Sequence, residues 1–244
     1  MKILSHNVYW FQGHPSRWGD EQVAEAPEVL EALTRLYASA EADVLCLQEV
    51  HRNDLAEAIA HELGMVAWRH ARGGLRPDYG GVILSRREAR LRDCTRADGH
   101  APHERVHLRA SLAWGKDRLE LAAVHLPSNR FVDSVEAGDA ARVAELRRVL
   151  AEPPRPNLVV GDMNCRTDSL PYRFIAQSGY VDAAVVVGGD AVLRRKVDYM
   201  WLDEAYADRL SKFVVLDFGA FCRTTPEGAT WRLSDHPPLL MELR

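Results

Sequence analysis

Several features that mark other classes of protein are missing from this sequence of 244 residues. No run approaches the ~20 consecutive apolar residues that cross a bilayer. The amino end, MKILSHNVYW, contains no signal-peptide core. Glycine, at 16 residues, is too rare for a collagen repeat, and 47% hydrophobic residues with a net charge of -4 exclude a disordered chain. The sequence therefore predicts a soluble, cytoplasmic globular protein that starts at or near Met1 and has no membrane span.

Cysteine and lysine are also scarce. The four cysteines are Cys46, Cys94, Cys165 and Cys222, and they form no CxxC pair, so reduced thiols are expected rather than a zinc knuckle or a disulfide framework. Only four of the 31 basic residues are lysines, which codon usage explains more readily than phosphate recognition. The 35 acidic residues outnumber the basic ones, which argues against tight, sequence-independent binding to long nucleic acid but allows a local basic groove.

Hydrophobic periodicity predicts one domain, residues 1–244, with many strands and few helices in an order that mixes hairpins with helical crossovers. Apolar runs of strand length occupy 2–8, 43–49, 80–85, 106–113, 118–126, 157–162, 197–202, 212–216 and 238–243. Helical spacing of apolar residues is found at 26–37, 53–63, 133–150 and 169–178. Asn53 is expected to cap the second helix at its amino end. No repeat of fixed period and no linker interrupts this order.

Polar side chains gather at the ends of these strands. They are Asn7, Glu49, His125, Asp162, Asn164, Asp198, Ser234, Asp235 and His236. A single acid at a strand end is usually an exposed loop residue or a cap, and a single His is usually structural. Four carboxylates on one rim, however, repel one another, and a divalent cation removes that cost. Their oxygen ligands favour Mg²⁺ or Mn²⁺ over Zn²⁺.

The same segments carry a resemblance to a known family. In chain order, HNVYW, LQEV, VHLPSN, GDMNC, KVDYMWL and SDHPPL resemble the successive signatures of the endonuclease/exonuclease/phosphatase superfamily of metal-dependent phosphoesterases. LQE alone is common by chance, whereas GDMN after an apolar strand and SDH near the carboxyl end are more specific. The resemblance implies an α/β fold, a four-layered α/β sandwich of two mixed β-sheets flanked by helices, with a metal site at one end.

The resemblance also implies roles for the matching residues. Asn7 and Glu49 match the metal-binding Asn and Glu of the family, and Asp235 matches the Asp that completes or supports that site. Asp162 and Asn164 match the pair that orients or activates the attacking water and stabilises the pentavalent phosphorus.

Two histidines belong to the same set of implied roles. His236 matches the His of the SDH motif, and Asp198 matches the acid that fixes it; the alternative is a structural ion pair. His125 matches the His that follows the strand in deoxyribonuclease-like and sphingomyelinase-like members, although a structural role is also open for it. The sequence does not decide whether Asp162 or His125 is the general base.

Candidate substrate-binding residues lie next to the motifs. Tyr79, in PDYGGVILS, resembles a Tyr of apurinic endonucleases that touches the backbone phosphate, and a Tyr packed at a strand start is an equal alternative. Trp10 belongs to an aromatic loop that either stacks a flat group or anchors itself. Arg130, Arg166 and the run 194–196 are interpreted as phosphate contacts or as a solvated face.

Residues outside the motifs give two further expectations. His51 and His103 are expected on the surface. The long loop 217–234 is expected to supply pocket wall through Phe218, Phe221 and Trp231, because long loops in compact domains tend to be functional.

Together these patterns predict a phosphoric ester hydrolase that depends on Mg²⁺ or Mn²⁺. A phosphodiesterase is favoured, nuclease-like or specific for a small phosphodiester, including short or single-stranded nucleic acid, in which an Asp/His-activated water bound to the metal attacks phosphorus. The alternatives are a phosphomonoesterase of a small metabolite, a lipid phosphodiesterase with Trp10 and Phe11 at the membrane, and a non-catalytic binding module. The last is disfavoured because every motif acid and His is present. No obligate protein partner is evident.

Overall fold

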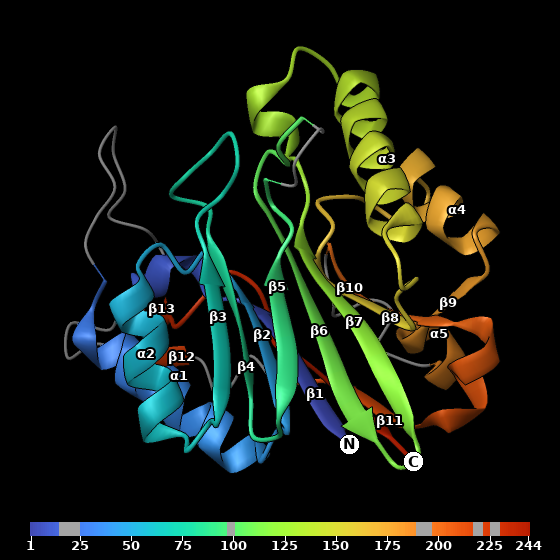
Figure 1. Cartoon of the computed structure of the whole chain (residues 1–244). Helices are drawn as coiled ribbons and strands as arrows, with labels where there is room; N and C mark the ends of the chain where they lie inside the picture. The colour runs from blue at the N-terminus through green and yellow to red at the C-terminus, as the bar shows by residue number, and fades with distance from the viewer. Residues whose placement is uncertain (15–24, 97–100, 189–196, 217–221, 225–229) are drawn as a thin grey trace.

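The fold is a sandwich of two six-stranded mixed sheets that pack face to face, with helices on both outer sides (Figure 1). The computed structural model describes residues 1–14, 25–96, 101–188, 197–216, 222–224 and 230–244. This is the expected four-layered α/β sandwich. Both sheets contribute to a shared interior, and we propose that residues 1–244 form one domain.

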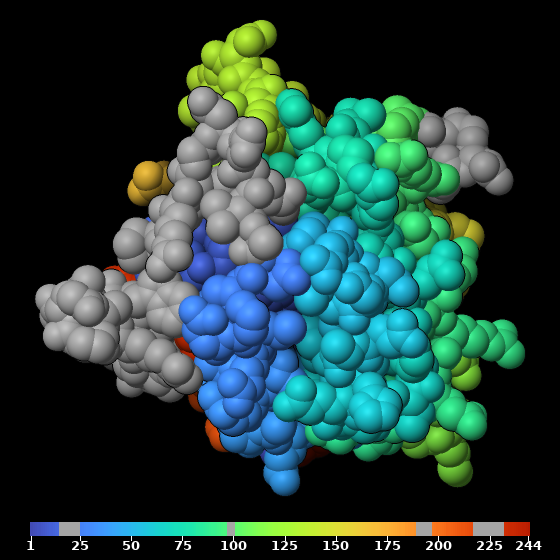
Figure 2. All heavy atoms as spheres, turned by 90° about the vertical axis from the view of Figure 1, so that its left-hand side faces the viewer, coloured from blue at the N-terminus to red at the C-terminus, as the bar shows by residue number. Residues whose placement is uncertain are grey.

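The first sheet has the strand order β11-β14-β1-β2-β4-β3. Its strands are β1 (Lys2–Asn7), β2 (Val44–Gln48), β3 (Ala67–Ala71), β4 (Gly81–Ser85), β11 (Leu210–Val215) and β14 (Leu239–Leu243). Only β1 and β2 run parallel among these neighbours, and helix α1 (Pro27–Ala40) crosses between them. Helix α1 and helix α2 (Asn53–Glu62) cover the outer face of this sheet, the side that faces the viewer in Figure 2.

The second sheet has the order β5-β6-β7-β8-β10-β9. Its strands are β5 (Ala89–Asp93), β6 (Val106–Trp114), β7 (Asp117–His125), β8 (Leu158–Asp162), β9 (Tyr180–Asp182) and β10 (Asp198–Asp203). Strands β7 and β8 are its parallel pair, joined across the outer face by α3 (Val135–Ala151). Helix α4 (Leu170–Gln177) packs beside α3, and α5 (Ala183–Val187) follows β9.

Short elements complete the described chain. They are the 3-10 helices η1 (Tyr9–Phe11), η2 (Asn129–Phe131) and η3 (Glu204–Arg209), and the two-stranded pair of β12 (Cys222–Thr224) with β13 (Thr230–Arg232). Among the residues with described positions, no helix is both long enough and apolar enough to cross a membrane.

The core explains why the central strands read as continuous apolar runs. Strands β2 and β8 are buried at every position because each has the opposite sheet on one side and helices on the other. Between the sheets, Cys46 and Ile83 share a cluster with Val160. On the helical sides, Leu33 of α1 and Leu146 of α3 pack onto the outer faces. The parallel pairs are therefore fixed in the centre of the molecule.

The predicted central strands and the four predicted helices are present, and the unpredicted elements are edge strands, the short helix α5 and the pair β12–β13, which lies within the segment 217–234 that was expected to be a loop. Strands β3, β5 and β9 were not predicted, and each is the last strand of its sheet. Strands β3 and β5 lack a partner on one side and carry exposed polar residues, which hides their apolar pattern, whereas β9 is only three residues long. Asn53 is the first residue of α2, and the preceding Arg52 occupies the cap without a side-chain hydrogen bond. Residues 194–196, Phe218 and Phe221 lie outside the described residues.

The close approach of β7 and β8 depends on Gly161. Its φ is +134°, and a Cβ at this position would stand 1.9 Å from the carbonyl oxygen of Val124. We expect Gly161→Ala to lower the free energy of unfolding by about 3 kcal/mol in urea denaturation, because the two strands must separate. Gly115→Ala is the control, since its φ is also positive (+62°) but nothing lies within 4 Å of the added Cβ. It should cost about 1 kcal/mol. Equal losses would contradict the steric account.

Candidate active site

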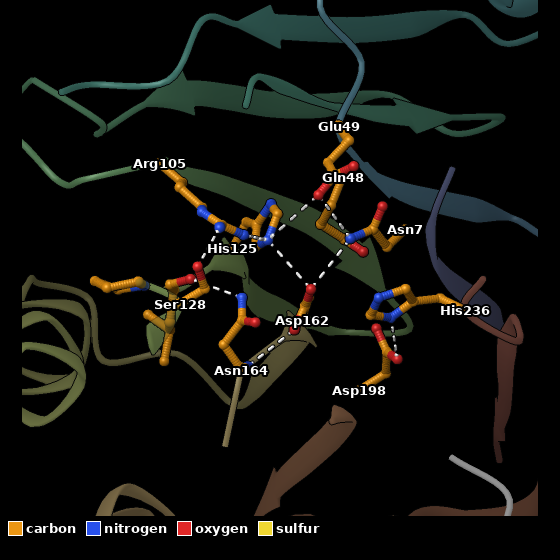
Figure 3. Close-up of polar contacts among 12 residues, drawn as sticks. Asn7, Gln48, Glu49, Arg105, His125, Ser128, Asp162, Asn164, Asp198 and His236 are labelled. Carbon is orange, nitrogen blue, oxygen red and sulfur yellow. Dashed lines mark hydrogen bonds and ion pairs between the residues drawn. The ribbon is translucent and has the colours of Figure 1, made fainter. Parts of the chain in front are cut away.

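A cluster of buried polar side chains lies where strands of both sheets end (Figure 3). The parallel pair β1–β2 aligns Asn7 with Gln48, and the parallel pair β7–β8 aligns His125 with Asp162. Strand β10 is antiparallel to β8, and its first residue, Asp198, stands opposite Asp162. Because the carboxyl ends of both parallel pairs meet the start of β10 at this edge, the side chains predicted from scattered motifs share one place.

Asn7 connects the two sheets through its amide. Its Nδ2 donates hydrogen bonds to Glu49 Oε1 (3.2 Å) and to Asp162 Oδ2 (3.1 Å), and its Oδ1 accepts one from the backbone N–H of Tyr9 (3.0 Å). Ser234 Oγ donates to the Asn7 carbonyl oxygen (2.7 Å). Glu49 leaves the end of β2 in the left-handed region (φ +61°), a strained conformation for a non-glycine residue. This turn directs the Glu49 carboxylate toward Asn7.

Asp162 lies at the centre of the cluster. Its Oδ2 faces Asn7 Nδ2 and His125 Nε2, the latter at 3.1 Å, and its Oδ1 accepts a hydrogen bond from the backbone N–H of Asn164 (2.9 Å). Burial acts to raise the pKa of the Asp162 carboxyl, but His125 and His236 hold that pKa below its usual value. Asp162 is therefore a carboxylate at neutral pH.

His236 and Asp198 form a close buried pair. His236 Nδ1 lies 2.7 Å from Asp198 Oδ2, and the two side chains are 13% and 3% exposed. Burial acts to lower the pKa of His236, but the charge and hydrogen bond of Asp198 raise it to about 10. On the other side of the ring, Nε2 lies 3.8 Å from Asp235 Oδ1. The His236 ring is thus an imidazolium at neutral pH, held between two carboxylates.

His125 has a different environment, because it contacts Arg105, a residue that the sequence analysis did not identify. Its side chain is fully buried, and Nε2 faces Asp162, Glu49 Oε1 (3.9 Å) and the guanidinium of Arg105. Burial and the adjacent Arg105 lower the pKa of His125 to about 4, so the ring is neutral. Arg105 is itself buried, donates to Ser128 Oγ (2.8 Å) and lies 4.2 Å above the Tyr79 ring.

Arg105 lies in no motif, and only the strand pairing could have identified it. It immediately precedes β6, whose first residue, Val106, is paired with His125 across the antiparallel β6–β7 ladder. A basic residue at the start of β6 must therefore lie at the same edge as the carboxyl end of β7. The position of Arg105 at this edge follows from the register between β6 and β7, which the sequence did not determine.

The predicted substrate-binding residues divide into two groups. Tyr79 lies at the cluster, with its ring centre 6.1 Å from that of His125 and 5.9 Å from that of Phe131. Arg130 is exposed in η2, with its guanidinium 5.8 Å from the Phe131 ring. Trp10 is buried at 2% exposure and donates to a backbone carbonyl (2.8 Å), which fits the anchoring alternative rather than substrate stacking. It packs edge-on against Tyr79 (4.9 Å), where it supports that ring and has no open face for a substrate.

Three further residues that the sequence analysis considered lie outside the cluster. Arg166 extends into solvent with 86% of its side chain exposed, 3.8 Å from Asp168. His103 was expected on the surface but is buried, and its Nδ1 lies 3.0 Å from Glu145 Oε2. His51 is partly buried, 3.5 Å from Glu25. None of these contacts belongs to the cluster of Figure 3.

The donors at this edge fit a hard divalent cation. The acids are Glu49, Asp162, Asp198 and Asp235, and Asn7 adds an amide. Two of their buried oxygens, Glu49 Oε2 and Asp198 Oδ1, have no hydrogen-bond partner among the described residues. Ligand atoms of Asp162, Asp198 and His236 also lie within 4.8 Å of one another. Carboxylate and amide oxygens with one imidazole suit Mg²⁺ or Mn²⁺ better than Zn²⁺.

The pairing of Asp198 with His236 gives a testable stability effect. We expect Asp198→Ala to lower the free energy of unfolding of the metal-free protein by about 3 kcal/mol, because it leaves a buried imidazolium unpaired. The double variant with His236→Ala should lose less than the two single variants combined, with a coupling of about 1 kcal/mol or more. The exposed pair Arg166–Asp168 is the control and should show no measurable coupling. Additive losses at Asp198 and His236 would rule out the ion pair.

Comparison with known proteins agrees with this geometry. The sequence model of the "Endonuclease/Exonuclease/phosphatase family" matches residues 4–236. No curated protein sequence matches the chain. Many solved structures share its fold, among them a sphingomyelinase and two proteins bound to DNA products.

Sphingomyelinase C from Streptomyces griseocarneus is 16% identical, with a TM-score of 0.68 over 100% of this chain and 99% of the other. D. rerio TDP2 complexed with single-strand DNA product is 17% identical, with a TM-score of 0.68 over 100% and 98%. The 3' phosphatase NExo from Neisseria, bound to product DNA hairpin, is 20% identical, with a TM-score of 0.66 over 100% and 99%. At these identities the likeness shows the fold alone. The family match over nearly the whole sequence shows that this chain belongs to the endonuclease/exonuclease/phosphatase family, a family of phosphoester hydrolases.

Proposed function

We propose that this protein is a phosphodiesterase that depends on Mg²⁺ or Mn²⁺. The observation that carries the proposal is the buried cluster in which Asp162 stands between a neutral His125 and a cationic His236. The negative charge of the neighbouring acids would be balanced by a bound cation. Membership of a family of phosphoester hydrolases supports the reaction type. The chemistry of the side chains supports the assignment of roles.

Asn7, Glu49 and Asp235 are the proposed metal ligands. Glu49 contributes a buried carboxylate oxygen, Oε2, without a hydrogen-bond partner among the described residues, and its other oxygen, Oε1, accepts a hydrogen bond from Asn7 Nδ2 (3.2 Å). Asp235 is 31% exposed and lies beside His236, so it faces the open side of the cluster. When bound, the divalent ion acts as a Lewis acid that polarises the phosphoryl group and offsets negative charge in the transition state.

Asp162 is the proposed acceptor of the proton from the attacking water. Its lowered pKa keeps it in the basic form, and the backbone N–H of Asn164 fixes one of its oxygens while Asn7 fixes the other. His236 is cationic because of Asp198, so it would donate a hydrogen bond to a phosphoryl oxygen as charge develops there. Asn164 is held by a hydrogen bond from its Nδ2 to the Leu126 carbonyl (3.0 Å). This fixes the amide at the edge of the cluster.

His125 is proposed as a positioning residue rather than the base. Its side chain is fully buried, its Nε2 is directed at Asp162 (3.1 Å), and its Nδ1 faces no hydrogen-bond partner among the described residues. A base must reach the proton that it removes, and Asp162 is the more central of the two. Arg105, stacked on Tyr79, would hold a second phosphoryl oxygen.

The charge at the cluster favours a diester over a monoester. Four carboxylates stand against two cations, His236 and Arg105, and one divalent ion cancels the excess. The resulting near-neutral site suits the single negative charge of a diester better than the double charge of a monoester. Phe131, which is partly exposed, lies beside it and would contact a flat group such as a nucleobase, consistent with a short or single-stranded nucleic acid, while the buried Tyr79 ring supports it.

The alternatives differ in how well they are supported. The neighbour described as a 3' phosphatase keeps phosphomonoesterase activity as the second candidate. The lipid phosphodiesterase rested on Trp10 and Phe11 as an apolar loop at a membrane, but both side chains are buried (2% and 0% exposed) and offer no such surface.

Metal removal tests the proposed dependence. We expect the protein to hydrolyse bis-p-nitrophenyl phosphate in Mg²⁺ or Mn²⁺, to lose this activity in excess EDTA, and to regain it when Mn²⁺ is restored, because the acids repel the anionic substrate without a cation. Hydrolysis should be faster for the diester than for p-nitrophenyl phosphate. Full activity in EDTA would contradict the metal dependence, and release of product from the monoester alone would favour the second candidate.

Substitution tests the roles of individual residues. We expect Asp162→Asn and His236→Asn each to lower kcat/KM at least about 100-fold, since each removes a group that acts on the reacting atoms. His125→Gln should lose less, because it acts through Asp162.

Matched controls are available on the surface. Asp208→Asn in η3 and His61→Asn in α2 change the same residue types at exposed positions and should keep kcat/KM within about twofold of the wild type. A loss of less than tenfold in Asp162→Asn, with the controls active, would remove Asp162 from the catalytic role.

A further inference from the structure

A second group of buried polar side chains lies on the opposite face of the second sheet. Side chains alternate along β6, so His107 points away from the face that its neighbour Val106 shares with His125. His107 is paired with Val124, which belongs to the core under α3 and α4. The group is therefore separated from the candidate active site by the sheet itself.

Cys94, His107 and Glu152 make up this group. Cys94 follows β5 and donates its backbone N–H to the carbonyl of His107 (2.9 Å), while Glu152 is the C-cap of α3. Cys94 Sγ donates to Glu152 Oε1 (3.1 Å), and His107 Nδ1 lies 3.8 Å from Glu152 Oε2. One ligand atom from each residue lies within 4.8 Å of the others. Zinc bonds of about 2.0–2.3 Å place tetrahedral ligand atoms roughly 3.3–3.8 Å apart, so small side-chain shifts would complete such a site.

The hydrogen bonding of His107 independently indicates a missing ligand. The residue is 1% exposed, yet neither ring nitrogen has a hydrogen-bond partner among the described residues. By contrast His103, whose ring packs edge-on against it with centres 4.9 Å apart, is paired with Glu145. Buried imidazoles are normally satisfied, and a metal ion is a partner that an imidazole nitrogen facing a thiol and a carboxylate would take.

The surrounding charges determine how such a site would be occupied. Arg92 Nη2 lies 2.9 Å from Glu152 Oε1 and is half exposed, so it competes with a cation for that oxygen. Arg109 is buried, and it donates to the backbone carbonyls of Glu152 and Pro154 rather than to the carboxylate. Of these two arginines, Arg92 is therefore the one whose guanidinium contacts the Glu152 carboxylate, a proposed ligand.

We propose that Cys94, His107 and Glu152 bind Zn²⁺ at a site separate from the hydrolytic centre, where the ion joins β5 and β6 to the end of α3. A thiolate, an imidazole and a carboxylate form a zinc donor set, unlike the oxygen-rich set of the active site. Binding forms a Zn–S bond, and the Cys94 thiol proton passes to solvent. Three protein ligands leave the fourth position to water.

Cobalt in place of zinc provides a direct test. The protein of residues 1–244 is titrated with Co²⁺ in excess Mg²⁺, which would occupy the oxygen-rich site of the proposed function. We expect one equivalent to give the near-ultraviolet charge-transfer absorption of a cobalt–thiolate bond, and Zn²⁺ to abolish it. Cys94→Ser should lose this absorption, whereas Cys46→Ala, at a buried thiol between the sheets, should keep it. Absence of the band in the wild type, or its persistence in Cys94→Ser, would overturn the proposal.

A second variant tests the site without removing a ligand. Arg92→Gln frees Glu152 and should tighten Zn²⁺ binding about two- to fivefold in calorimetry, the range that corresponds to loss of an exposed ion pair. Arg90→Gln, at an exposed arginine two residues earlier on β5, should leave the affinity unchanged. Zn²⁺ should also raise the Tm of the wild type in Mg²⁺. Unchanged Zn²⁺ affinity in Arg92→Gln would show that Glu152 is not a ligand.

Discussion

Repulsion between buried carboxylates is the constraint on which the rest of the site depends. Four acids from both sheets meet where charge is poorly solvated, so each must be compensated. The protein supplies part of the compensation: His236 lies against Asp198, and the Asn7 amide bridges Glu49 and Asp162. Buried oxygens without a partner among the described residues show the remaining deficit, which the proposed divalent cation would meet. In the proposed function, metal binding and phosphate binding therefore share one electrostatic cause.

The fold serves this constraint by bringing strand ends together. Each sheet contains one parallel pair in its centre, and the carboxyl ends of both pairs lie at the same edge (Figure 3). Close pairing of β7 and β8 needs a glycine at position 161, directly before the central acid. The left-handed backbone of Glu49 turns its side chain back over the end of β2. A glycine at position 161 and a strained backbone at Glu49 thus both help to place a carboxylate at this edge.

The sequence predicted the parts of the structure that depend on local pattern. The central strands are buried on both faces and read as apolar runs, so Asp162 and Glu49 could be recognised as polar residues at their ends. The position of Arg105 depends on the register between β6 and β7, which no local pattern specifies. The sequence left two roles open for Trp10, stacking a substrate or anchoring its loop, because an aromatic side chain suits both, and packing against Tyr79 buries it in the anchoring role. His103 is buried because it pairs with Glu145 on α3, a residue distant in the sequence that no local pattern connects to it.

The claim that the acid cluster holds a catalytic divalent ion can be tested directly by anomalous diffraction. A crystal soaked in Mn²⁺ and phosphate should show an anomalous peak in contact with a Glu49 carboxylate oxygen, with phosphate density between it and His236. The same soak of Glu49→Gln should lose the peak or greatly weaken it. Phosphate bound at His236 in the wild type without any manganese at Glu49 would contradict the account, because charge compensation would then come from the protein alone.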